Sequence, residues 1–152
     1  METIDLKDRQ ISLERTFNVS AELMWEAWKN PDHLSQWWGP NGFATTIHKM
    51  DLKEGGEWLL TMHGPDGTNY PNRSVFTEVI PMKRIAYQHF NPDFLSEVDF
   101  QSDGETTTLI WTMTFKTADL LQAVLKAHNA AEGLKQNGER LQNYLTDKLI
   151  QS

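Results

Sequence analysis

Apolar and polar residues alternate through much of the chain between residues 10 and 116, which is the pattern of strands that bury one face. The stretch 106–116 shows it most clearly, because large apolar side chains alternate there with threonines and Ile110. These apolar side chains are Leu109, Trp111, Met113 and Phe115. In the stretch 56–63 the corresponding positions are Trp58, Leu60 and Met62. We therefore expect both sets to face the interior, with Trp111 buried.

Short segments rich in Gly, Pro, Asn and Asp separate these stretches and predict turns. The predicted strands are 10–18, 44–52, 56–63, 74–80, 84–90, 95–102 and 106–116. Strands that follow one another so closely can only be antiparallel neighbours. The pattern thus predicts one antiparallel sheet of about seven strands.

Two short helices are expected between the first and second of these strands. Ser20 precedes an apolar helical pattern, so its hydroxyl can cap a helix that runs to about Lys29. Pro31 suits the first turn of a second helix that continues through Trp37. The sequence Gly-Pro-Asn-Gly at 39–42 then predicts a loop.

After residue 116 the periodicity becomes helical and stays so to Ile150. The stripe consists of Leu121, Val124, Leu125, His128, Ala131, Leu134, Gly138, Leu141, Leu145 and Leu149. A continuous helix over 118–150 needs an apolar surface to cover it, and the sheet supplies one. The order of elements predicts a single α+β domain, 1–152, in which a curved antiparallel sheet wraps around a long C-terminal helix.

The composition argues against several kinds of partner. Fourteen basic and twenty-one acidic residues give a formal net charge of −7, and no cluster of Lys and Arg suits nucleic acid. No run approaches the roughly 18 apolar residues of a membrane span. The polar first residues do not resemble a secretory signal, and the absence of cysteine fits a reducing compartment. We therefore expect a cytoplasmic protein that binds no nucleic acid and does not span a membrane.

Several motifs, spread over nearly the whole chain, resemble one known family. They are the segments 19–28 (VSAELMWEAW), 30–34 (NPDHL) and 36–40 (QWWGP), then Gly55-Gly56 with Trp58, and Gly64-Pro65-Asp66-Gly67. In this order they resemble the activator of heat-shock protein 90 ATPase homologues, within the START/SRPBCC superfamily. The resemblance implies a helix-grip fold, and the family name implies a chaperone partner and a role in the stress response.

Two residues of the last helix depart from the family pattern. Leu134 stands where the family usually has tryptophan, and Gly138 stands where a bulky residue is usual. Both changes shrink side chains on the helix face that we assign to the interior. We therefore expect open volume beside Gly138.

In a helix-grip fold the residues between sheet and helix form both the core and the wall of a pocket. The candidate ligand-pocket residues are Trp38, Trp58, Leu60, Met62, Leu109, Trp111, Met113, Phe115, His128, Leu134 and Gly138. His128 can be read either as a core histidine with one hydrogen bond or as a polar anchor for a ligand. The histidines lack metal-ligand spacing, so we expect no metal and no cofactor. By position, His33 should be exposed and His63 should face outward.

Three functions are compatible with this sequence. The favoured one is binding or carriage of a hydrophobic small molecule, lipid-like or a metabolite, in an internal cavity. One alternative is an interaction module that assists a chaperone ATPase or another protein. The other is a cyclase- or aromatase-like enzyme, although no nucleophile motif or catalytic residue can be assigned. A closed apolar cavity would favour binding, a buried titratable cluster the enzyme, and an apolar patch on the outer sheet face the interaction module.

Overall fold

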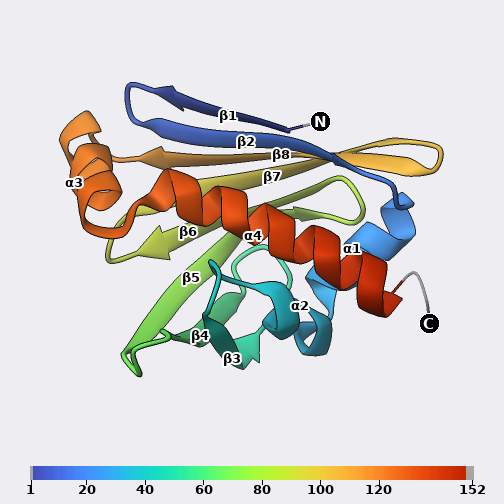
Figure 1. Ribbon diagram of the computed structural model, residues 1–152, viewed down its shortest axis with the longest axis horizontal. Coiled ribbons are helices and arrows are strands. Elements are labelled where there is room, and N and C mark those ends of the chain that lie inside the picture. Colours follow the sequence, from blue (N-terminus) through green and yellow to red (C-terminus); the bar gives the residue numbers. More distant parts are fainter. Residues whose placement is uncertain (1, 150–152) are drawn as a thin grey trace.

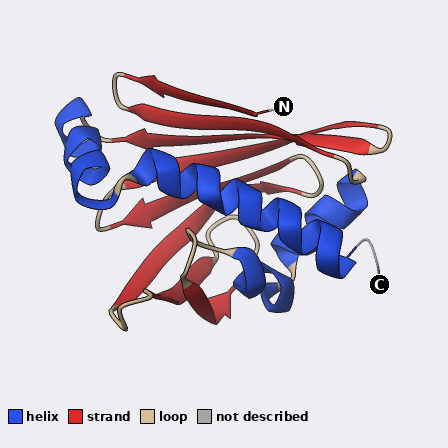
Figure 2. Ribbon diagram, viewed as in Figure 1, coloured by secondary structure: helices blue, strands red, loops and turns tan. Residues whose placement is uncertain are grey.

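The computed structural model describes residues 2–149 and shows a long antiparallel sheet with helices on one face (Figure 1). The strands are β1 (Glu2–Lys7), β2 (Gln10–Phe17), β3 (Ala44–Met50), β4 (Glu57–His63), β5 (Asn69–Ile80), β6 (Arg84–Phe90), β7 (Phe94–Asp103) and β8 (Thr106–Phe115). The helices are α1 (Ala21–Lys29), α2 (Pro31–Trp37), α3 (Ala118–His128), α4 (Ala130–Tyr144) and the π-helical turn η1 (Leu145–Leu149). Helix α4 crosses the sheet, as Figure 2 shows. The predicted α+β helix-grip architecture is confirmed.

The strands form a single sheet in the order β1-β2-β8-β7-β6-β5-β4-β3. All neighbours are antiparallel, and the pairing of β2 with β8 joins the N-terminal hairpin to the last strand of the sheet. The sheet has eight strands, one more than predicted, because the sequence pattern did not reveal β1. Ile4 and Leu6 alternate with polar residues in β1, but this is an edge strand in which Leu6 stays 51% exposed. Such a strand buries too little apolar surface to leave a clear periodic signal.

Strand β5 begins at Asn69, five residues before the predicted start at 74. Its first part contains Pro71, which cannot donate to a ladder and normally argues against a central strand. Here that part pairs only with β4, because pairing of β5 with β6 starts at Arg73. Pro71 is therefore accommodated where the strand has a partner on one side only.

Side-chain caps start both short helices; the cap at Ser20 was predicted, and the cap at Asn30 was not. The Leu23 amide donates to the Ser20 hydroxyl (3.2 Å) and begins α1. The Asp32 amide donates to the Asn30 side chain (3.0 Å) at the start of α2, and Pro31 occupies its first turn. These local bonds satisfy backbone donors that a helix start leaves free.

The C-terminal helical region is broken, so the prediction of one continuous helix is wrong. Asn129 adopts a left-handed conformation (φ 48°), and α3 ends there while α4 starts in a new direction (Figure 1). Asparagine tolerates this conformation better than most residues. The three-to-four spacing passes through the break and gives no sign of it. The predicted end at Ile150 lies outside the described residues.

The inner face of the sheet and α4 enclose the core. The predicted strand phase is confirmed, since Leu109, Trp111 and Phe115 are at most 2% exposed. Leu134 and Leu141 of α4 and Leu145 of η1 are buried. No helix among residues 2–149 is both long enough and apolar enough to cross a membrane.

The outer face of the sheet is largely polar. The Arg84 guanidinium donates to Glu78 (2.5 Å) and Asp99 (2.7 Å) across three neighbouring strands, and it also contacts Glu97. The Thr16 and Thr108 hydroxyls, 2.8 Å apart, share a hydrogen bond between β2 and β8. The outer face is therefore suited to contact with water.

Candidate functional site

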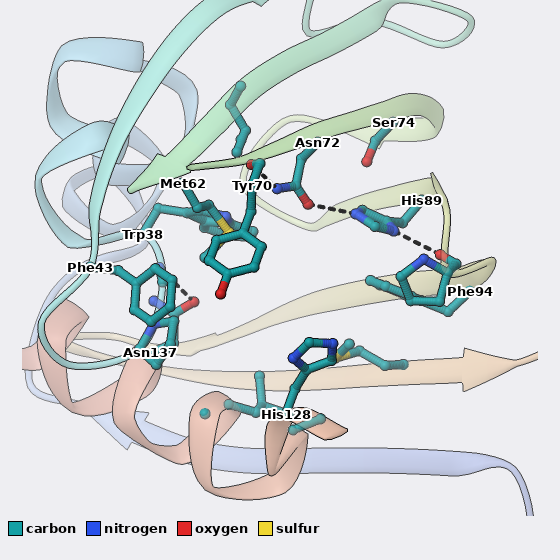
Figure 3. A pocket seen from close by; sticks show the side chains of 18 of the residues that line it. Trp38, Phe43, Met62, Tyr70, Asn72, Ser74, His89, Phe94, His128 and Asn137 are labelled. Carbon is teal, nitrogen blue, oxygen red and sulfur yellow. Dashed lines mark hydrogen bonds between the residues drawn. The ribbon is translucent and has the colours of Figure 1, made fainter. Parts of the chain in front are cut away.

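A cavity of about 510 Å³ lies between the inner face of the sheet and the junction of α3 with α4. Eight of the eleven predicted pocket residues lie on its wall: Trp38, Trp58, Leu60, Met62, Trp111, Met113, His128 and Leu134. Figure 3 shows side chains from β4, β5, β6 and the helices converging on this space. None of the residues on the wall is Asp, Glu, Lys or Arg. The cavity is therefore apolar with a few uncharged polar groups and two imidazoles.

Three predicted residues lie elsewhere. Leu109 and Phe115 face inward but are packed in solid core at the two ends of β8, with 1% and 0% exposure. The cavity opens only over the middle of that strand, beside Trp111 and Met113. Strand alternation gives the face of a residue, but it does not give the position of a void along the strand.

The expectation of open volume at Gly138 is wrong. A Cβ atom at this position would lie 3.1 Å from Leu13 Cδ2 and 3.5 Å from Arg15 Cδ. Strand β2 therefore approaches α4 closely at this point, and glycine allows the approach. Gly138 is a packing residue that lies away from the cavity.

Trp38 is the centre of the aromatic part of the wall. Its ring centroid lies 4.9 Å from that of Trp58 and 5.5 Å from that of Trp111. Trp58 in turn meets Tyr87 edge to face at 5.0 Å. These separations are those of favourable aromatic pairs. One side of the cavity is thus a rigid surface of rings.

Two side chains of α4 hold the segment that carries Trp38. Asn137 donates to the Trp37 carbonyl (2.9 Å) and accepts from the Gly39 amide (3.2 Å), and both bonds are buried. Arg140 Nη1 donates to the carbonyls of Trp38 (3.1 Å), Gly39 (2.9 Å) and Pro40. We call Asn137 and Arg140 the α4 clasp. It satisfies a loop backbone that would otherwise be buried without partners.

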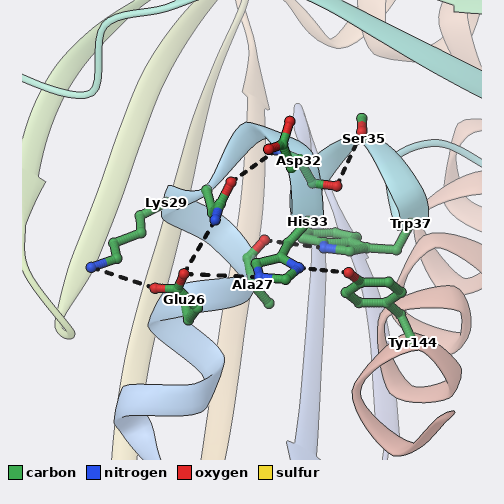
Figure 4. Close-up of polar contacts among 9 residues, drawn as sticks. Glu26, Ala27, Lys29, Asp32, His33, Ser35, Trp37 and Tyr144 are labelled. Atoms are coloured by element: carbon green, nitrogen blue, oxygen red, sulfur yellow. Dashed lines mark hydrogen bonds and ion pairs between the residues drawn. The ribbon is translucent and has the colours of Figure 1, made fainter. Parts of the chain in front are cut away.

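Helices α1, α2 and α4 are joined behind Trp37 (Figure 4). The Trp37 indole donates to the Ala27 carbonyl (3.2 Å), and His33 Nδ1 lies 2.6 Å from the Tyr144 hydroxyl. The other nitrogen of His33 is 3.9 Å from Glu26. His33 is thus half-buried, and the expectation of an exposed residue is wrong, because the side chain fills the junction of three helices. Burial raises the pKa of Tyr144.

The polar end of the cavity is formed by Asn72 and Ser74 of β5 and by His89 of β6 (Figure 3). His89 is 9% exposed and stacks on Phe94 at 4.5 Å between centroids. Its Nε2 lies 2.6 Å from Asn72 Oδ1, and its Nδ1 lies 2.8 Å from the Pro92 carbonyl oxygen. Burial lowers the pKa of His89, whereas the bond to Pro92 and the charge of Asp93 act the other way.

Sequence reasoning did not find this polar end. Asn72 fell in a segment expected to be a turn, so no face could be assigned to it. His89 could have been found, because Ile85, Tyr87 and His89 alternate along β6 on the inner face. A histidine in phase with buried residues was the available signal.

His128 lies at the rim of the cavity, at the end of α3, and is exposed. In Figure 3 it lies across the cavity from Asn72 and His89. It is not a core histidine, because its side chain is exposed at the rim. His63 lies on the outer face as predicted and bonds Thr46 (2.8 Å) and Asn69 (2.7 Å). Among residues 2–149, no three His, Asp or Glu side chains gather in a way that could hold a metal ion.

A model of one protein family matches most of the chain. The family is described as Activator of Hsp90 ATPase homolog 1-like protein, and the match covers residues 18–146. It includes the two short helices, the clasped loop, the cavity and α4. Comparison with curated proteins finds no match.

Several solved structures share the fold. A protein from Arthrobacter aurescens is similar with a TM-score of 0.90 and 20% identity, over 95% of this chain and 91% of that one. A protein from Mycobacterium smegmatis is 24% identical with a TM-score of 0.84, over 96% of each chain. An AHSA1-like protein from Aeromonas hydrophila is 22% identical with a TM-score of 0.72, over 90% of this chain and 92% of that one. At these identities the similarity concerns the fold alone.

Proposed function

Since the chain belongs to the family of Activator of Hsp90 ATPase homolog 1-like proteins, of the SRPBCC superfamily, we propose that it binds a small hydrophobic molecule in the cavity beneath α4. The observation that carries this proposal is the cavity itself. Its volume of about 510 Å³ lies within the range of roughly 300–1,000 Å³ that is typical of ligand pockets. Burying an apolar ligand there would release water from aromatic and aliphatic walls.

The wall chemistry supports an apolar ligand. Trp38, Trp58 and Trp111 present ring surfaces that are already held in place by one another and by the α4 clasp. Such a surface loses little side-chain entropy when a ligand packs on it. The few polar groups, above all Asn72 and His89, would fix the orientation of the ligand.

Filling the cavity tests the proposal. Leu134 lies on its wall and Leu6 lies on the exposed edge strand, so Leu134→Trp and Leu6→Trp add the same side chain inside and outside the cavity. We expect Leu134→Trp to weaken binding of the neutral dye Nile red by about tenfold or more, because its ring takes ligand volume. Leu6→Trp should leave binding unchanged. Equal dye binding by both variants, each with a cooperative thermal transition, would refute a ligand site in this cavity.

The alternatives have less support. An interaction module that used the outer face of the sheet would need an apolar patch there. That face instead carries Arg84 with its three carboxylates and many threonines. Among residues 2–149, the large apolar side chains that are exposed are few: Leu6 on β1, Tyr70 on β5, and Ile80 with Met82 at the turn from β5 to β6. An enzyme of this kind would need a cluster of titratable groups at the cavity, and the described wall has two imidazoles, on opposite sides of the cavity, but no carboxylate, lysine or arginine.

A further inference from the structure

The hydrogen-bond partners of His89 indicate its protonation state. Both ring nitrogens face oxygen atoms, Asn72 Oδ1 at 2.6 Å and the Pro92 carbonyl at 2.8 Å. The Asn72 amide cannot be turned around without loss, because its Nδ2 donates to the Tyr70 carbonyl (2.9 Å). In the reversed orientation, Oδ1 would face that carbonyl oxygen.

Only one protonation state of His89 satisfies all three contacts. A neutral imidazole has one N–H, so it can donate to Asn72 or to Pro92, and its second nitrogen then faces an oxygen lone pair. An imidazolium donates to both. The geometry is therefore that of a positively charged side chain in an apolar site.

This charge has no counter-charge on the cavity wall. The charge of Asp93, in the β6–β7 turn, acts on the pKa of His89, but this side chain is exposed. The other titratable groups around His89 are Tyr87 on its own strand, Tyr70 on β5 and His128 at the end of α3. None of them is an acid that ionises near neutral pH.

Arg73 of β5 is also close in sequence, but it points to the outer face and stacks on Phe90 at 4.8 Å. A charged His89 would therefore be buried without a partner, which is costly. Burial accordingly lowers the pKa of His89. A ligand that brings a negative charge would reverse this effect.

Ser74 adds a donor at the same end of the cavity. It is the cross-strand partner of His89 in the pairing of β5 with β6 and is only 3% exposed. Figure 3 draws no hydrogen bond between its hydroxyl and the other pocket side chains shown. The hydroxyl can thus donate to an oxygen atom of a ligand beside the imidazolium.

We propose that the hydrophobic ligand of this cavity carries an anionic head group, a carboxylate or its equivalent, which lies beside His89 and Ser74 and is taken up together with a proton on His89. This inference rests on the proposed function and deepens it. The apolar part of the ligand would pack on the tryptophan wall, and the head group would supply the missing counter-charge.

Decanoic acid and decanamide test this inference, because they differ in charge but hardly in size. Decanoate is ionised throughout the neutral range. Titration calorimetry in two buffers of different ionisation enthalpy should show proton uptake with decanoic acid and none with decanamide. Decanoic acid should bind about tenfold more tightly near pH 6 than near pH 8, because binding is linked to protonation of one group. Decanamide should show no such dependence.

Three histidine variants assign the proton. His89→Gln should abolish proton uptake and the pH dependence, whereas His63→Gln, on the outer face, should keep both. Loss of the pH dependence in His128→Gln instead would overturn the assignment to His89. If His89→Gln fails to fold, two other measurements test the inference. One is the number of protons that the unaltered protein takes up with decanoic acid, and the other is the affinity of Ser74→Ala for both probes. Ser74→Ala should bind decanoic acid about tenfold more weakly than the unaltered protein does, and it should bind decanamide equally well.

The outcomes separate this inference from the function on which it rests. If both probes bind equally at both pH values without proton uptake, the anionic head group is wrong and the hydrophobic cavity site stands. If neither probe nor Nile red binds, both proposals fall.

Discussion

Replacing Asn137 by alanine should destabilise the protein by roughly 2–4 kcal/mol, because both of its buried hydrogen bonds reach a distant segment. The side chain donates to the Trp37 carbonyl and accepts from the Gly39 amide, and it is only 6% exposed. Its loss leaves two backbone groups unpaired, each costing about 1–3 kcal/mol when water cannot reach it. Water entering the space would bring the total to the lower end.

The matched control is Asn143→Ala, an exposed asparagine on the same helix. Both substitutions gain similar helix propensity, about 0.5 kcal/mol, so the difference between them isolates the clasp. Urea unfolding followed by tryptophan emission gives both free energies. Values for the two variants that agree within about 0.5 kcal/mol would refute the reasoning, since surface substitutions vary by that much.

Asn137→Asp tests the same two hydrogen bonds by replacing the amide with a group that can ionise. One carboxylate oxygen can still accept from Gly39, but the other faces the Trp37 carbonyl oxygen, so the folded state favours the protonated acid. Its pKa is then raised above the unfolded value. The contribution of the protonated acid to stability is present at low pH and is lost as the pH rises. The free energy of unfolding of this variant should therefore increase, relative to that of the parent protein, as the pH falls into the mildly acidic range.

Two further predictions concern other buried positions. Gly138→Leu should destabilise the protein by about 1–3 kcal/mol through overpacking against Leu13 and should not change its affinity for Nile red. A stable variant with weaker dye binding would instead show that there is open volume beside Gly138. Burial raises the pKa of Tyr87, against hydrogen bonds to Ser96 and Trp111, so the unfolded phenol ionises first, above about pH 10. The stability it contributes is present below that pH and is lost above it; Tyr87→Phe should therefore show a shallower alkaline decline, and equal slopes would contradict this.

Most of the fold could be predicted because its signals are local. Ser20 and Asn30 cap helices from adjacent positions, and strand alternation placed Trp111 correctly because one face of β8 is buried along most of its length. The errors have equally local causes. Asn129 changes the direction of the chain through one backbone torsion, and an apolar stripe is blind to such a change.

The site was only partly predictable because a cavity is a property of packing in three dimensions. Alternation identified the wall residues of β4 and β8, but it could not distinguish Met113, which borders the void, from Phe115, which is packed solid. Gly138 was assigned to the void because the family usually has a bulky residue there, and the sequence does not reveal how near β2 comes. The α4 clasp joins residues about a hundred positions apart, and no spacing in the sequence predicts such bonds.

The contact of Trp38 with its neighbours also decides how the protein interacts with light. Five indoles, those of Trp28, Trp37, Trp38, Trp58 and Trp111, form a connected network with centroid separations of 4.9 to 5.9 Å. At such distances excitation passes among the rings faster than it is emitted, so the fluorescence belongs to the network and not to any one ring. Their transition dipoles must couple as well, which gives paired bands of opposite sign in circular dichroism. A molecule in the cavity that quenches Trp38 would therefore also reduce the emission of rings that it does not contact.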